Sequence, residues 1–139
     1  MGLKNLDASI VDSQIPIADK LSRGNIMASA CPSRKILKHL TSQWGVLVLV
    51  TLLGGTHRFG ALRKKIDGVS ERMLVQTLQS LESDGMLLRQ DFSTNSPHVE
   101  YTLTELGITA AEKIQSLVDW IECNVNVIVD VKEKGTSDN

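Results

Sequence analysis

Three glycine-containing breaks constrain the fold of this chain most strongly. They are Gly54-Gly55, Asp67-Gly68 and Asp84-Gly85. Glycine readily adopts the backbone conformations that end helices and close tight turns. The breaks therefore separate short helices, one predicted over residues 57–66 and the next from Ser70 to the break at Asp84-Gly85. Two short helices joined by a turn that contains glycine form a helix-turn-helix arrangement.

The helix after Ser70 has the clearest periodicity. Ser70 can cap its N-terminus, and Leu74, Leu78 and Leu81 follow at i, i+4 and i+7, which places them on one face. At 100° per residue, an opposite face carries Arg72, Gln76 and Gln79, together with Ser83. The leucines are therefore expected in the core, with the Arg and Gln side chains facing outward.

Two further helices are predicted before the first break. Residues 33–40 have apolar side chains at helical spacing, with Ser33 as a candidate N-cap. Residues 44–53 are apolar almost all round, a pattern that fits a buried strand as well as a buried helix. The length of this segment, its Gly-Gly end and its helical neighbours favour the helix.

The period changes from helical to alternating at Met86. Residues 87–92 and 99–103 alternate between apolar and polar side chains, and the polar residues 93–98 separate them. This pattern predicts a two-stranded hairpin with a long polar tip.

A long apolar stripe follows the hairpin. Thr104 is a candidate N-cap, and the apolar residues recur at steps of three and four, widened by Val118 and Trp120. They are Leu106, Ala110, Ile114, Leu117, Ile121, Val125 and Ile128. Because this helix has more apolar face than a small domain can cover, we expect it to pack on a second subunit as a homodimer.

The 139 residues correspond to about one domain. Residues 1–30 form a poorly specified N-terminal arm interrupted by Pro16 and Gly24, residues 31–131 form the domain, and the polar residues 132–139 form a disordered tail. The resulting fold class is mainly α with a small β-hairpin.

Composition excludes several protein classes. The longest apolar run, residues 46–53, is shorter than a membrane span, and no secretory signal is visible, so we expect a cytoplasmic protein without membrane contact. The two cysteines and three scattered histidines match no metal site or catalytic motif. We therefore expect neither an enzyme nor a bound metal or cofactor.

Charge is distributed unevenly although the net charge is −1. Residues 57–72 carry five cations against two acids, whereas residues 104–139 carry three lysines against seven acids. The first segment can face an anion such as double-stranded DNA.

Several spaced motifs in this order resemble the HxlR-type transcriptional regulators between about Cys31 and Trp120. They are Cys31-Pro32, Trp44, Arg58-Phe59-x-x-Leu62-Arg63 with Ile66 and Gly68, Ser70-x-x-Met73-Leu74 with Gln76, Leu78-x-x-Leu81-Glu82-x-Asp84-Gly85, and Val99-Glu100-Tyr101-x-Leu103-Thr104-x-Leu106-Gly107. The resemblance implies a dimeric winged helix-turn-helix DNA-binding protein of bacterial type, related to the MarR group, with N- and C-terminal dimerisation helices.

Candidate DNA contacts fall into three groups. Arg72, Gln76 and Gln79 can reach base edges in the major groove. Ser70 and the free N–H groups of its helix can lie close to a phosphate. Further candidates are the charged side chains before this helix and in the hairpin, which are Arg58, Arg63, Lys64, Lys65, Arg89 and His98. The hairpin tip has no Arg or Lys, so we expect a weak contribution from it.

Cys31 has two interpretations. The resemblance implies an oxidant or electrophile sensor, because some HxlR-type regulators use a cysteine at this position. Arg34, Lys35 and the nearby helix N-terminus can lower the pKa of its thiol. The alternative is a small packing residue beneath the dimer helices. Cys123 lies off the apolar stripe and is assigned a structural role, with a resolving role in an intersubunit disulfide as the alternative.

These features together predict a homodimeric repressor that binds a pseudo-palindromic operator. Oxidation of Cys31 or a small-molecule effector between the subunits would change the spacing of the two recognition helices. The alternative is a winged-helix module for protein–protein interaction that binds no operator.

Overall fold

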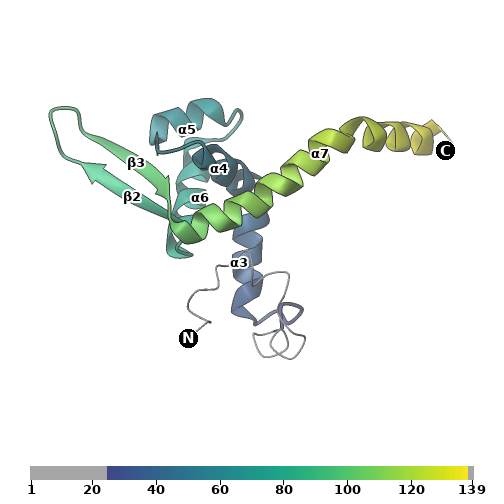
Figure 1. Ribbon diagram of the computed structural model, residues 1–139, viewed down its shortest axis with the longest axis horizontal. Helices are drawn as coiled ribbons and strands as arrows, with labels where there is room; N and C mark the ends of the chain where they lie inside the picture. Colours follow the sequence, from purple (N-terminus) through teal and green to yellow (C-terminus); the bar gives the residue numbers. More distant parts are fainter. Residues whose placement is uncertain (1–24, 138–139) are drawn as a thin grey trace.

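The computed structural model describes residues 25–137. Most of the predicted N-terminal arm therefore lies outside the described residues. The elements are α3 (Pro32–Thr41), α4 (Gln43–Leu53), β1 (His57–Arg58), α5 (Phe59–Lys65), α6 (Glu71–Ser83), β2 (Leu87–Phe92), β3 (His98–Leu103) and α7 (Glu105–Ser137). Figure 1 shows β2 and β3 projecting from one side of the helical body and the far half of α7 projecting from the other. The predicted winged helix-turn-helix fold is confirmed.

The core is aliphatic and lies where α4, α6 and the sheet meet. Its centre is formed by Val48 and Leu49 of α4, Leu62 of α5, and Leu74 and Leu81 of α6, none of which is exposed. Residues 44–53 are thus a buried helix rather than a buried strand, which confirms the preferred interpretation. The three predicted leucines of α6 all face this core.

α3 differs in its first turn from the prediction. Pro32 occupies the first turn and Cys31 is the N-cap residue, so the predicted cap at Ser33 is wrong. Proline is favoured there because it needs no backbone N–H partner. At the other end, Ser42 separates α3 from α4 and its hydroxyl accepts a hydrogen bond from the N–H of Gly45. The two helices meet at an angle of 70°.

The sheet has a third strand that the sequence did not predict. The predicted helix over residues 57–66 begins only at Phe59, because His57 and Arg58 form β1 and pair with Tyr101 and Glu100 of β3. A two-residue strand shows no periodicity, and the pairing joins residues far apart in the sequence. The sheet is antiparallel in the order β1-β3-β2, with Leu87 opposite Leu103 and Phe92 opposite His98.

The first turn of α7 docks on the turn between α6 and β2. The hydroxyl of Thr104 donates to the carbonyl of Gly85 and accepts from the N–H of Gly107, which confirms Thr104 as the N-cap. The N–H of Thr104 donates to the carbonyl of Met86. Gly107 lies directly against the same carbonyl, where a Cβ atom would overlap it. These contacts fix the direction in which α7 leaves the domain.

Beyond Ala111 and Ile114, which pack in and against the core, α7 extends away from the body of the protein. It remains helical to Ser137, so residues 132–137 are helix where a tail was expected, and residues 138–139 lie outside the described residues. Leu117, Trp120, Ile121 and Val125 are 43–58% exposed. No single helix within residues 25–137 is long and apolar enough to cross a membrane; α3 and α4 pass that test only as a bent pair.

We predict that Gly107→Ala destabilises the domain by about 2–3 kcal/mol, because the added methyl group overlaps a backbone carbonyl that cannot move without shifting the turn. Urea denaturation followed by circular dichroism measures the free energy of unfolding. Gly135→Ala is the matched control in the same helix, where no atom lies within 4 Å of the new Cβ. Its stability should equal or slightly exceed that of the wild type, because alanine is the better helix former. Equal stability of both variants would refute the docking role.

Candidate nucleic-acid interface

The second helix of the helix-turn-helix, α6, presents a polar face to solvent. The Ser70 hydroxyl accepts a hydrogen bond of 3.1 Å from the N–H of Met73, which confirms the predicted N-cap. Arg72, Gln76 and Gln79 are exposed, as their spacing predicted. The remaining N–H groups of the first turn give this end of α6 a partial positive charge that suits a phosphate.

The cations that precede α6 lie mostly on α5. Arg58 is the N-cap residue of α5, and Arg63, Lys64 and Lys65 form its last turn. All four are exposed. The guanidinium of Arg63 lies 3.7 Å from the Glu71 carboxylate, a pair exposed enough to contribute little to stability. The ammonium of Lys65 donates to Nε2 of His57 at 2.9 Å.

A groove of about 850 Å³ separates α6 from the sheet and from the start of α5. It brings together four of the predicted site residues from four different elements, which are Arg58, Gln79, Arg89 and His98. Glu71 and Glu82 line the same groove, and the guanidinium of Arg89 lies 3.6 Å from the carboxylate of Asp91. The cations on this side of α6 are thus offset by neighbouring acids.

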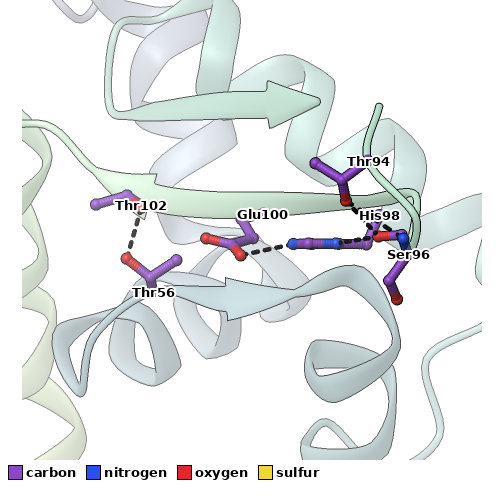
Figure 2. A network of polar contacts seen from close by, with 6 residues as sticks. All are labelled: Thr56, Thr94, Ser96, His98, Glu100 and Thr102. Atoms are coloured by element: carbon purple, nitrogen blue, oxygen red, sulfur yellow. Dashed lines mark hydrogen bonds and ion pairs between the residues drawn. The ribbon is translucent and has the colours of Figure 1, made fainter. Parts of the chain in front are cut away.

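The hairpin formed by β2 and β3 is held by its own polar contacts, which Figure 2 shows. Nδ1 of His98 contacts the carbonyl of Ser96 and Nε2 contacts the carboxylate of Glu100, both at 2.7 Å. The ring of Phe92 stacks on His98 with centroids 4.9 Å apart. At the other end of β3, the hydroxyls of Thr56 and Thr102 are 2.7 Å apart. His98 is therefore engaged within the hairpin, and its contact with DNA stays a prediction.

Cys31 is half-buried at the N-terminus of α3. The Ser33 hydroxyl donates a hydrogen bond to it and lowers the pKa of its thiol, and backbone groups of Ser33, Arg34 and Asn25 act in the same direction against partial desolvation. The expected direction of the pKa shift is confirmed; its cause is hydrogen bonding, which includes backbone groups in the first turn of α3, and not the charges of Arg34 and Lys35. Cys123 is exposed on α7.

The structure also reveals contacts on α3 that the sequence analysis missed. Nδ1 of His39 lies 2.7 Å from Oδ2 of Asp84, which joins the end of α3 to the end of α6. Lys35 and Lys38 line a groove that also contains Gln76. The sequence did indicate that α3 is positively charged, because the helix contains three Lys and Arg residues and no acid. The packing of α3 beside α6, however, has no local sequence pattern.

Within residues 25–137, no group of three His, Cys, Asp or Glu side chains could hold a metal ion. The polar surface of α6 and its flanking cations constitute the candidate site. Its residue types are those that proteins use to contact phosphates and base edges.

Comparison with known proteins places this geometry in a family. Residues 39–128 match the model of the HxlR-like helix-turn-helix family. The chain is 52% identical to the uncharacterised HTH-type transcriptional regulator YtfH of Escherichia coli K12, across 88% of this chain and 97% of that protein.

Solved structures agree with this match. A structure described as the transcriptional regulator YtfH from Salmonella typhimurium is 54% identical, with a TM-score of 0.76 over 79% of this chain and 98% of that one. The redox regulator HypR in its reduced form is 29% identical, with a TM-score of 0.64 over 71% of this chain and 98% of that one. In its oxidised form HypR is 31% identical, with a TM-score of 0.62 over 68% and 97%. The chain belongs to the HxlR-like helix-turn-helix family, whose members are DNA-binding transcriptional regulators and not enzymes.

Proposed function

We propose that this protein is a sequence-specific transcriptional repressor that binds a pseudo-palindromic operator as a homodimer. The observation that carries the proposal is the polar face of α6, where Arg72, Gln76 and Gln79 are all exposed opposite three buried leucines. Arg can donate two hydrogen bonds to guanine, and Gln can pair with adenine, in the major groove. The capped N-terminus of α6 at Ser70 supplies a phosphate contact that fixes the helix on the duplex.

The homodimer is supported by the apolar surface that one chain leaves uncovered. Leu117, Ile121 and Val125 repeat along α7 and are each at least 43% exposed, and Ile36 and Leu37 of α3 are similarly exposed. An apolar surface of this kind is typical of an interface between subunits. A two-fold dimer would place two α6 helices in successive major grooves, about 34–36 Å apart. Occupation of a promoter by such a dimer excludes the transcription machinery.

Redox control is supported by the environment of Cys31. A lowered thiol pKa increases the thiolate fraction, and the thiolate is the nucleophile that attacks a peroxide oxygen. The structural relative HypR is itself described as a redox regulator. Oxidation of Cys31 would disturb the first turn of α3, and α3 contacts α6 through His39 and Asp84. A small-molecule effector between the subunits is the alternative trigger.

We predict that Arg72→Ala combined with Gln76→Ala removes the preference for operator DNA. Each good bidentate contact contributes about 1–3 kcal/mol to discrimination, so the double variant should bind the DNA flanking its own gene no more tightly than an unrelated duplex. Fluorescence anisotropy with both duplexes measures the ratio of dissociation constants. Gln43→Ala combined with Lys132→Ala removes one glutamine and one cation outside α6 and should keep the preference. A preference that survives the α6 changes would favour the interaction-module alternative.

We predict that hydrogen peroxide changes the affinity of the wild type for its preferred duplex, whereas Cys31→Ser is insensitive. Peroxide converts the Cys31 thiolate to a sulfenic acid at the N-terminus of α3, which serine cannot form. The dissociation constant is measured before and after treatment and again after reduction with a thiol. Cys123→Ser is the matched control and should respond like the wild type. An equal response of wild type and Cys31→Ser would exclude Cys31 as the sensor and leave it a packing residue.

A further inference from the structure

A second groove lies on the side of α6 that faces away from the sheet. It has a volume of about 760 Å³ and lies between α3 and α6. Lys35 and Lys38 line its α3 side, and Gln76 and Gln79 line its α6 side. Gln79 also lines the groove next to the sheet. α6 therefore projects between two grooves, and the proposed base-reading residues lie on its exposed face.

The position of α3 along this groove is fixed by two features. The 70° bend at Ser42 turns α3 away from the axis of α4. The His39–Asp84 contact then ties the last turn of α3 to the C-terminal end of α6, with side chains only 19% and 12% exposed. Lys38 directly precedes His39 in the chain. Lys35 lies one turn before Lys38, on the same side of the helix. The two lysines are thus held beside α6.

The groove beside α3 is the more positive of the two. Asp84 is the one acid among its lining residues, and its carboxylate is engaged by His39. Lys35 and Lys38 are exposed, and neither side-chain ammonium group forms a hydrogen bond or an ion pair with any residue in the range 25–137. In the groove next to the sheet, by contrast, Glu71 and Glu82 oppose Arg58 and Arg89.

We infer that α3 is a second DNA-contacting element, with Lys35 and Lys38 binding the phosphate backbone of the duplex that α6 reads. A helix in the major groove, which is about 12 Å wide, has a phosphate backbone on each side. α5 and the hairpin adjoin the first groove of α6 and face one backbone. On the other side of α6 lies α3, and its cations Lys35 and Lys38 can bind the second phosphate backbone. This inference rests on the proposed function, because it requires α6 to lie in the major groove.

The test is the salt dependence of DNA binding by Lys35→Gln combined with Lys38→Gln. Each lost phosphate contact reduces the slope of log K against log salt by about 0.9, so the slope should fall by about 1.8 per bound chain. Fluorescence anisotropy between 50 and 200 mM salt is performed with the flanking DNA and with an unrelated 30-base-pair duplex. Because phosphates carry no sequence information, both affinities should fall by a similar factor and the preference should remain.

Matched controls separate this role from a general effect of charge. Lys132→Gln combined with Lys134→Gln removes two lysines from the far end of α7 and should leave the slope unchanged. Each single variant, Lys35→Gln or Lys38→Gln, should show about half of the reduction in slope that the double variant shows. Equal thermal midpoints in circular dichroism show that the variants are folded.

The outcomes distinguish this inference from the proposal on which it rests. A wild-type protein that prefers the flanking DNA, with an unchanged slope in the double variant, would overturn the role of α3 and leave the operator-binding proposal standing. A wild type that binds neither duplex would overturn both. A slope reduced equally by the α3 and α7 changes would also overturn the inference, because the effect would then reflect net charge.

Discussion

The burial of one face of α6 is the constraint on which the rest of the structure depends. Leu74, Leu78 and Leu81 are 2% exposed or less and pack into the core with Leu49 of α4. Removing a leucine side chain of this kind from a core typically costs about 2–5 kcal/mol, so the rotation of α6 about its own axis is strongly fixed. Because the period of a helix is fixed, the same burial holds Arg72 and Gln76 toward solvent.

The remaining elements position this polar face. The sheet and α5 form the groove on one side of α6, and α3 forms the groove on the other. α7 follows β3, docks through Thr104 on the turn after α6, and extends away from the domain, as Figure 1 shows. Its docking at Gly107 connects the orientation of the apolar α7 surface to the orientation of α6. In the proposed homodimer, a signal that changed how the two α7 helices pack would therefore alter the spacing of the two α6 helices.

The sequence predicted those features of the fold that depend on interactions within a single helix or hairpin. The leucine spacing, the caps at Ser70 and Thr104 and the alternation of the hairpin each lie within one element, and each was confirmed. β1 was missed because its two residues become a strand only by pairing with Tyr101 and Glu100. The placement of α3 was missed for the same reason, since the His39–Asp84 contact joins residues 45 positions apart. The roles of the site residues in binding DNA stay predictions.

Hydroxyl-radical footprinting of the protein on the DNA that flanks its own gene tests the central claim most directly. If two α6 helices read one operator, each strand should show protected stretches centred about 10–10.5 base pairs apart and related by two-fold symmetry. Two related half-sites should occupy the major grooves that these stretches flank. Uniform weak protection along the fragment, or one isolated protected stretch without a symmetry mate, would contradict the account of a dimer whose paired α6 helices recognise a specific sequence.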